Sequence, residues 1–395
     1  MDWEREQWIE QIEAGASVSE VAEQYQVSRK TLYKWMERYR GYGQEGLRDL
    51  SRAPQQHPQA VSELWRERIR AARQQRPRWG APKLAWWLEQ QYRGEQAPSV
   101  STIGRVLHDS GLSHSRRRIR AQGTGPFEPA DKANEVWAVD FKGWCRTGDG
   151  VRCEPLTISD QATRYLLCCQ SMPSTRTEAV QAVMERVFLS YGLPERIRSD
   201  NGSPFAVRGE CGLTELAVWW IELGIHSERI DPGHPQQNGR HERMHRTLQE
   251  ATMQPPASTA RKQQQRLDEF RRDYNEQRPH QALGQRVPAS LYVPSERIYR
   301  RGLAQVDYGN WPVRQVCSGG KIGFQKEGIF VSHALRGKLV GLEQIDERCW
   351  NLWFHRHWLG VWEQGGGGLW RPRAWAAQRA RRSASQGSAA GSRLD

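Results

Sequence analysis

The sequence has few cysteines and no arrangement of them that indicates a cross-link or a metal site. Seven cysteines occur in 395 residues, and no two of them form a Cys-x-x-Cys pair. An odd number without paired spacing argues against a disulfide framework and against a zinc site built on cysteine.

Long apolar runs are also missing. No window approaches the ~18 consecutive apolar residues that cross a bilayer. The first residues, Met1-Asp-Trp-Glu-Arg-Glu6, lack the basic and then apolar order of a secretion signal. We therefore expect a cytoplasmic protein without a membrane partner.

Acidic residues are outnumbered. Lys and Arg exceed Asp and Glu by 58 to 45, which gives a formal net charge of +13. A basic balance suits a polyanionic partner such as nucleic acid, but simple solubility explains the charge equally well. The length exceeds the roughly 100 to 200 residues of one domain, so several domains are expected.

Residues 1–50 have the spacing of a helix-turn-helix, a DNA-binding unit. Its inward residues would be Val21, Ala22, Val27, Leu32 and Trp35. Ser28 would cap a second helix, whose outward residues would be Arg29, Lys30, Thr31 and Lys34. Such side chains reach phosphates and base edges. An ordinary helical hairpin has similar spacing, but the cap and the basic second helix favour DNA binding.

A second helical unit follows a proline-containing linker at 51–60. Residues 61–112 again predict a helix-turn-helix, although Gly104 weakens its last helix. Its candidate DNA contacts are Ser101, Thr102 and Arg105. A basic linker at 113–130 then separates this unit from the rest of the chain.

The period of the apolar residues changes in residues 131–296. Strand-like runs occur at 136–141, 151–158, 164–170, 197–199 and 225–227, and helical patterns occur at 177–191 and 215–223. Three successive strands followed by alternating helices and strands predict an α/β domain, a mixed sheet flanked by helices.

The C-terminal part has a different composition. Pro255-Pro256 interrupts the helical pattern, and a polar helix is expected from about 257 to 277. Residues 297–363 carry short, Trp-rich strand patterns typical of a small β-barrel, which we expect to bind DNA. Residues 364–395 predict a disordered basic tail.

Three acids stand where they could work together. Asp140 ends an apolar run, Asp200 opens the turn Asn201-Gly-Ser-Pro204, and Glu242 lies among basic and amide side chains on an expected helix. Three carboxylates on rigid elements can hold two Mg²⁺ ions, which serve phosphodiester chemistry. We infer that Asp140 bridges both ions. Each acid also has a simpler explanation: an ion pair with Lys142, a turn cap, or a solvated salt bridge.

The expected helix around Glu242 would have two faces. Met244, Leu248 and Ala251 would be buried. Asn238, Glu242, His245, Arg246 and Gln249 would face the substrate, with Arg240 close to them on the same helix. A fourth acid, Asp160, also follows a strand, but we interpret it as a turn residue because the chain then folds back.

Four sequence blocks together resemble the integrase-core transposases of bacterial insertion sequences. They are Trp137-Ala-Val-Asp140, Arg198-Ser-Asp-Asn-Gly-Ser-Pro-Phe205, His234-Pro-Gln-Gln-Asn-Gly-Arg-His-Glu-Arg-Met-His-Arg-Thr-Leu248 and Tyr274-Asn-Glu-Gln-Arg-Pro-His-Gln-Ala-Leu283. The resemblance implies an RNase H-like fold and a metal triad of Asp140, Asp200 and Glu242. It also implies two Mg²⁺ or Mn²⁺ ions per active site.

The resemblance further implies a reaction and its partners. Hydrolysis at the element ends would free a 3′-hydroxyl, which would attack target DNA. Partners would be double-stranded DNA and further copies of the chain in a dimer or larger synaptic complex, with no small-molecule substrate. The expected location is the bacterial cytoplasm, at the nucleoid.

The match to that family is incomplete. The spacing from Asp200 to Glu242 is longer than in retroviral integrases, and their N-terminal zinc module is absent. Two alternatives therefore stay open: a nuclease of the same fold that does not join strands, and a DNA-binding regulator with an inactive core.

Overall fold

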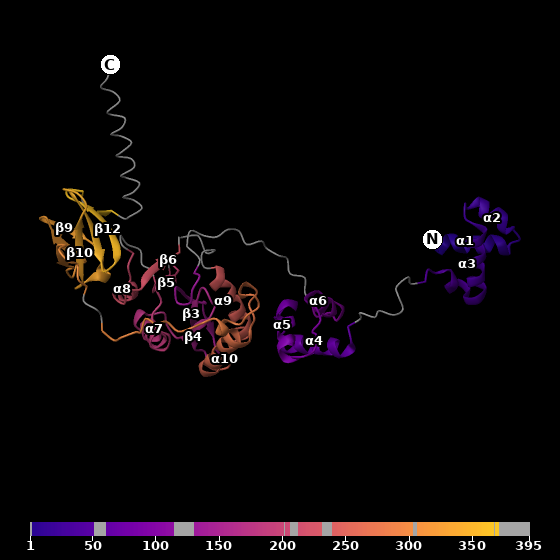
Figure 1. The fold of residues 1–395 in the computed structure, drawn as a ribbon, viewed down its shortest axis with the longest axis horizontal. Coiled ribbons are helices and arrows are strands. Elements are labelled where there is room, and N and C mark those ends of the chain that lie inside the picture. The colour runs from indigo at the N-terminus through magenta and orange to yellow at the C-terminus, as the bar shows by residue number, and fades with distance from the viewer. Residues whose placement is uncertain are drawn as a thin grey trace, which may run out of the picture. The chain divides into compact units, whose positions relative to one another are not determined.

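The computed structural model describes residues 2–50, 61–113, 130–200, 202–205, 212–230, 239–302, 306–366 and 368–370. The chain divides into two compact units, Met1–Glu63 and Leu64–Asp395, and Figure 1 labels their elements. The predicted linker at 51–60, nearly all of that at 113–130 and most of the predicted tail lie outside the described residues. Within the described residues, no helix combines the length and the apolar character needed to cross a membrane.

The first unit is the predicted helix-turn-helix. It consists of α1 (Asp2–Glu13), α2 (Val18–Gln24), α3 (Arg29–Tyr42) and a 3₁₀ turn (Gly43–Leu47). Ser28 caps α3 as expected, because its Oγ accepts a hydrogen bond of 3.1 Å from the Thr31 amide. Its buried core includes four of the five predicted inward residues, and Val27 is half-buried.

A second group of three helices follows: α4 (Glu63–Gln75), α5 (Ala81–Gln91) and α6 (Val100–Asp109). Ser99 caps α6 through the Thr102 amide at 3.3 Å. Gly104 does not interrupt α6, whose residues Ile103 and Leu107 lie in a buried core with Leu84 of α5. Packing between the helices therefore outweighs the weak helix propensity of one glycine.

The central domain is a mixed sheet, as predicted. Its strands are β1 (Val136–Phe141), β2 (Cys145–Arg146), β3 (Arg152–Asp160), β4 (Leu166–Met172), β5 (Arg196–Ser199) and β6 (His226–Arg229). β1 pairs antiparallel with β3 and parallel with β5, and β5 pairs parallel with β6. β4 and the short β2 both pair with β3.

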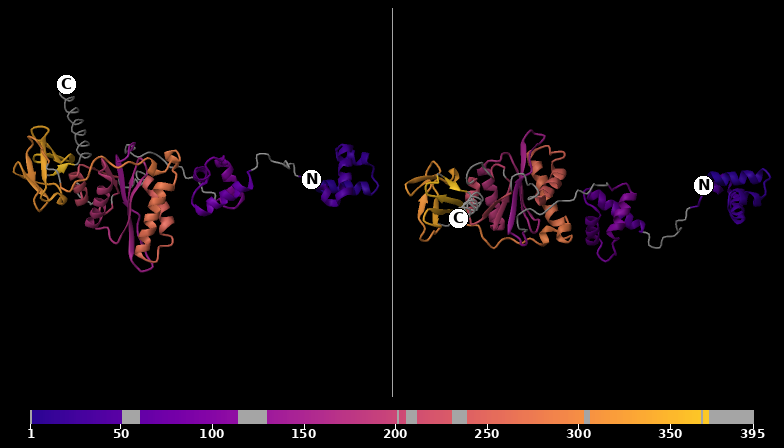
Figure 2. Two further views of the ribbon diagram at one scale, coloured as in Figure 1. Left: turned by 60° about the horizontal axis from the view of Figure 1, so that its bottom comes forward. Right: turned by 90° about the horizontal axis from the view of Figure 1, so that it is seen from above.

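Helices cover both faces of this sheet (Figure 2). They are α7 (Thr177–Tyr191), α8 (Glu215–Glu222), α9 (Gly239–Thr252) and α10 (Ala260–Arg272), and a π-helical turn at Asp273–Gln277 follows α10. Leu167 of β4 packs with α7 and α8, whereas its neighbour Leu166 packs with α9 and α10. Because successive strand side chains point to opposite faces, the two helix pairs lie on opposite sides. The predicted mixed sheet flanked by helices is confirmed.

The C-terminal region is all β. Strands β7 (Val313–Gln315), β10 (Leu339–Gln344), β11 (Cys349–Phe354), β12 (His357–Glu363) and β13 (Leu369–Trp370) form a five-stranded antiparallel sheet, and β8 (Lys321–Phe324) pairs with β9 (Glu327–Phe330). Short 3₁₀ turns lie at Gln281–Leu283, Pro288–Ser290 and His333–Leu335. The region expected to form a small barrel thus consists of two separate antiparallel sheets over one shared apolar core.

Helix α8 joins this C-terminal core to the central domain. Trp220 packs in the central core, while Ile221 packs in the C-terminal core. A helix that is apolar all round is one buried on several sides, which explains the sequence Leu216-Ala-Val-Trp-Trp-Ile221.

Candidate active site

The three predicted acids come from neighbouring elements of the central domain. Asp140 is the fifth residue of β1, and Asp200 directly follows the last residue of β5. In the register of these parallel strands Val139 lies opposite Ser199, so the two acids occupy the next equivalent positions. Glu242 lies in the first turn of α9.

The face of β1 on which Asp140 lies follows from alternation. Trp137 and Val139 are buried against α7 and α8. Asp140 is therefore on the opposite face, which α9 covers. The structure thus brings Asp140 towards the helix that carries Glu242.

The pKa of Asp140 is shifted by burial and by the charges of the other two acids. Burial is the main cause that raises the pKa of Asp140 to about 7, and the negative charges of Asp200 and Glu242 raise it further. Such a concentration of hard oxygen ligands and like charge fits a divalent cation, which would relieve the repulsion.

Gly202 leaves room for the Asp200 carboxylate. The Gly202 amide donates a hydrogen bond of 3.1 Å to Asp200 Oδ1. A Cβ atom at position 202 would lie 3.0 Å from Asp200 Oδ2, a distance that real Cβ contacts rarely reach. The turn after β5 therefore depends on glycine to bring its backbone this close to the acid.

The prediction for His245 is wrong in one respect: its side chain does not lie on an open face. His245 is only 6% exposed and His241 only 1%. Both imidazole Nε2 atoms lie 2.7 Å from Thr157 Oγ1, and His241 Nδ1 lies 2.9 Å from Ser159 Oγ. Ala251, expected to be buried, is exposed.

The reason is the polar surface that β3 presents to α9. Leu156 and Ile158 are buried against α7 and α8, so Thr157 and Ser159 point to the other side. Histidines one helical turn apart can satisfy these hydroxyls. The signal that sequence reasoning missed is the pairing of two small hydroxyl residues with two histidines at i and i+4.

These histidines are neutral at physiological pH. Burial lowers the pKa of His241 to about 3 and that of His245 to about 2. One ligand atom from each of Asp140, His241 and His245 lies within 4.8 Å of the others, a grouping that could hold a metal ion. His245 Nδ1 lies 3.7 Å from Asp140 Oδ2.

The remaining candidate contacts on α9 differ in exposure. Arg246 is exposed and Gln249 is half-buried. Arg240 is half-buried and donates a hydrogen bond of 3.0 Å to the main-chain oxygen of Gln161. Asn238 lies outside the described residues.

The interpretation of Asp160 as a turn residue is confirmed. Its carboxylate is buried and accepts hydrogen bonds of 2.7 Å from the amides of Asn134 and Thr163. The Thr163 hydroxyl also donates to it. Through these hydrogen bonds the Asp160 carboxylate stabilises the chain reversal between β3 and β4.

A basic cavity of about 490 Å³ opens beside α9. Its lining includes Arg164, Arg240, Arg243 and Arg278, together with Tyr274. Burial, followed by the charge of Arg240, lowers the pKa of Arg164, and burial also lowers that of Arg278. An anion bound in this cavity would lower the electrostatic repulsion among these partly desolvated cations.

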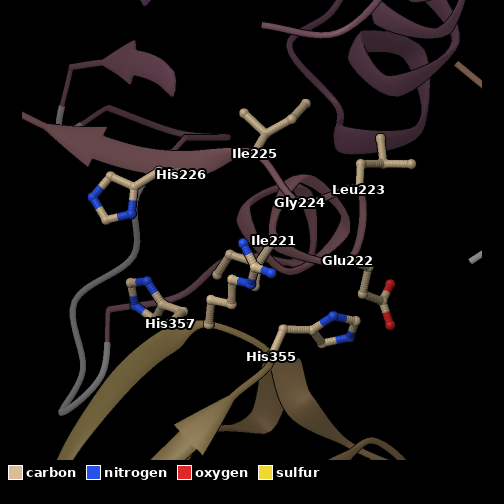
Figure 3. Close-up of a pocket in the computed structure, with 9 residues that line it drawn as sticks. Ile221, Glu222, Leu223, Gly224, Ile225, His226, His355 and His357 are labelled. Carbon is tan, nitrogen blue, oxygen red and sulfur yellow. The ribbon is translucent and has the colours of Figure 1, made fainter. Parts of the chain in front are cut away.

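A second cavity, of about 470 Å³, lies between α8 and the turn from β11 to β12 (Figure 3). His226 and His357 line it with ring centroids 6.2 Å apart, and His355 and Glu222 lie on its other side. None of Asp140, Asp200 and Glu242 lines it. Glu222 is paired with Lys338, so the cavity offers no cluster of free carboxylates.

The predicted DNA contacts of the helical units are accessible. Arg29, Lys30 and Lys34 on α3 are exposed, and so are Ser101 and Arg105 on α6. Thr31 and Thr102 are half-buried beside their capping serines. The Ser28 hydroxyl is exposed but engaged with Thr31.

Models of known families match these regions. Two models described as integrase core domain match residues 130–235 and 223–288. Residues 130–288 of this chain therefore match the integrase core domain. A helix-turn-helix model matches residues 4–55 and a homeodomain-like model matches 31–107, so the N-terminal units are helix-turn-helix domains.

The chain is also similar to proteins of insertion elements. It is 27% identical over 242 residues to an uncharacterized protein of insertion element IS407 from Burkholderia multivorans, covering 59% of this chain and 82% of that one. It is 25% identical over 206 residues to an uncharacterized protein of IS476 from Xanthomonas euvesicatoria, covering 51% and 57% respectively.

Among solved structures, the catalytic core domain of HTLV-2 integrase in complex with magnesium aligns with a TM-score of 0.32 at 10% identity. The alignment covers 41% of this chain and 98% of that one.

The raised pKa of Asp140 predicts how the stability of the protein depends on pH. Its folded value of about 7 lies above the ordinary 3.8. The folded protein therefore holds this proton more tightly, and stability falls as pH rises from about 4 to about 7. Asp140→Asn removes this penalty, so the variant should be more stable than the parent at pH 8, by at most about 4 kcal/mol.

The measurement is the thermal unfolding midpoint in EDTA between pH 4 and pH 8. The advantage of Asp140→Asn should be largest at pH 8 and shrink as pH falls towards 4. The exposed acid Asp131, changed to Asn, is the matched control and should show no such trend. An Asp140→Asn midpoint below the parent's at pH 8 would contradict the shift.

Proposed function

We propose that this protein is the DNA transposase of an insertion sequence. It binds the terminal inverted repeats of the element, hydrolyses phosphodiester bonds at its ends and joins the freed 3′-hydroxyls to target DNA. The main support is that Asp140 and Asp200 occupy adjacent positions on paired strands, with Glu242 on the helix that covers this face. Burial, and then the charges of Asp200 and Glu242, raise the pKa of Asp140. The similarity to proteins of two insertion elements agrees with this role.

In this proposal the three acids hold two Mg²⁺ or Mn²⁺ ions, and Asp140 contributes to both. The ions supply an activated oxygen nucleophile and neutralise charge at the phosphorus. Asp140 is fixed by its strand and Asp200 by the Gly202 turn. Rigid support of this kind keeps ligands in place without reorganisation during the reaction.

Both reactions are phosphoryl transfers with balanced bonds. In hydrolysis a water oxygen bonds to phosphorus, the P–O3′ bond breaks, and a proton passes to the 3′ oxygen that leaves. In joining, that 3′-hydroxyl oxygen bonds to a target phosphorus and a target P–O3′ bond breaks. The proton of the attacking hydroxyl ends on the new target 3′-hydroxyl.

DNA recognition is assigned to the helical units and to the basic cavity. The exposed cations of α3 and α6 would read and grip the element ends. The arginines beside α9 would hold a DNA phosphate close to Glu242, since Arg240 and Arg243 flank this acid in the sequence. Bringing two element ends together requires more than one copy of the chain, so a dimer or larger assembly on DNA is part of the proposal.

Neutral replacement of each acid tests the chemistry. Asp140→Asn, Asp200→Asn and Glu242→Gln should each reduce cleavage and joining by at least about 100-fold. Mutation of a residue that only orients a metal ligand already lowers metal affinity or activity by about 10- to 100-fold. Binding of element-end DNA should persist. Glu250→Gln, on the same helix, is the control and should keep its activity.

The assay uses labelled element-end DNA with Mg²⁺ and resolves both nicked and joined products. Joined products from the parent protein support a transposase. Nicks alone would indicate a nuclease instead, and binding without any cleavage would indicate a regulator. Full activity in any of the three acid variants would refute the proposed triad.

The first helix-turn-helix should govern recognition of the element ends. Replacing Arg29 and Lys34 together by Ala should weaken binding to repeat DNA. The slope of the logarithm of the binding constant against the logarithm of the salt concentration should become shallower by about one unit for each phosphate that is no longer neutralised. Arg40→Ala, in the last turn of the same helix, is the control. Binding isotherms at several salt concentrations that do not differ from the parent's would exclude α3 as the reading helix.

The basic cavity should contribute equally to the binding of any DNA sequence. Arg164→Gln combined with Arg243→Gln should weaken binding of repeat and unrelated DNA by the same factor, because phosphate contacts carry no sequence information. Arg261→Gln on α10, an exposed arginine that does not line the cavity, serves as the comparison. Fluorescence anisotropy with both DNAs measures this, and an unchanged affinity for both would show that no phosphate binds in the cavity.

A further inference from the structure

Among the described residues, one nitrogen atom at the candidate active site has no hydrogen-bond partner. The Thr157 hydroxyl donates to the main-chain oxygen of Asp140 at 3.1 Å and lies 2.7 Å from Nε2 of both His241 and His245. A hydroxyl has one hydrogen and two lone pairs. If its hydrogen goes to Asp140, both imidazoles must donate to it from Nε2.

This assignment fixes the other ring nitrogen of each histidine as an acceptor. His241 Nδ1 meets the Ser159 hydroxyl at 2.9 Å, so it is satisfied. Within the part of the chain that the structure describes, no hydrogen bond reaches His245 Nδ1. Its charged neighbour is Asp140 Oδ2 at 3.7 Å, which is too long for a hydrogen bond.

A lone pair that faces an ionised carboxylate oxygen is repelled by it, and a cation bound between the two atoms would relieve this repulsion. Divalent cations bind nitrogen and oxygen ligands at about 2.0 to 2.2 Å, so two ligands of one ion lie between about 3 and 4.4 Å apart. The observed 3.7 Å falls within this range. Thr157 and His241 hold the ring in the orientation that such a ligand needs.

We propose that His245 Nδ1 is a ligand of the cation held by Asp140. The site would then combine one imidazole nitrogen with carboxylate oxygens. Imidazole favours transition ions, whereas Mg²⁺ prefers oxygen. His245 therefore biases the site towards Mn²⁺ and away from Mg²⁺. This inference rests on the proposed function only in taking Asp140 as a cation ligand.

The test uses the full chain and Mn²⁺ as the probe. Pulsed electron paramagnetic resonance detects a nitrogen bound to Mn²⁺ directly, without any catalytic turnover. The parent should show a nitrogen coupling that changes when its histidines carry ¹⁵N. His245→Gln should lose the coupling, while His226→Gln, which changes an exposed histidine of β6, should retain it.

Titration calorimetry provides the second measurement. His245→Gln should reduce the preference for Mn²⁺ over Mg²⁺ by about 10-fold or more, the usual effect of weakening a metal's ligand set. The ¹⁵N experiment on the parent keeps the proposal testable even if His245→Gln does not fold.

The outcomes separate this inference from the proposed function. If Mn²⁺ binding depends on Asp140 but the parent shows no nitrogen coupling, His245 only orients its neighbours and the inference is overturned while the triad stands. A coupling that persists in His245→Gln overturns it as well. If Asp140→Asn leaves Mn²⁺ affinity unchanged, both the inference and the proposed metal triad fail.

Discussion

The arrangement of this molecule depends on holding three like-charged carboxylates together. Burial and repulsion make the ionised form of Asp140 costly, and the fold has to offset that cost elsewhere. Trp137 and Ile197 are fully buried in the core behind β1 and β5. This apolar packing anchors the two parallel strands, and their register places Asp140 and Asp200 at adjacent positions.

Helix α9 connects this charged site to the rest of the domain through two different faces. On its inner face, His241 and His245 lie where apolar side chains would be expected, and they form hydrogen bonds with hydroxyls of β3. Its outer face carries arginines beside a basic cavity. Glu242 is exposed, and its sequence neighbour Arg243 lines the cavity. That combination suits a polyanion whose phosphate needs both a cation-binding site and neutralising side chains.

Much of the fold follows from periodicity in the sequence. Strand-like runs in the sequence predict β1 and β3, and the helical pattern at 177–191 predicts α7 within the bounds observed. The three acids follow from their positions after strands and on a helix. The hydroxyl and histidine contacts could not be predicted, because Thr157 and His245 are far apart in sequence and a polar residue is expected to face solvent. For the same reason the sequence pattern predicts the wrong face for His245. Local patterns also cannot tell that the C-terminal strands pair as two sheets.

The central claim is that Asp140, Asp200 and Glu242 hold divalent cations. Crystals grown with Mn²⁺ and analysed at a wavelength where manganese scatters anomalously test it most directly. The account predicts two anomalous peaks about 3.5 to 4 Å apart, both in contact with Asp140. The claim would be contradicted if, at saturating Mn²⁺, no anomalous peak lies beside these three carboxylates, or if manganese binds elsewhere instead.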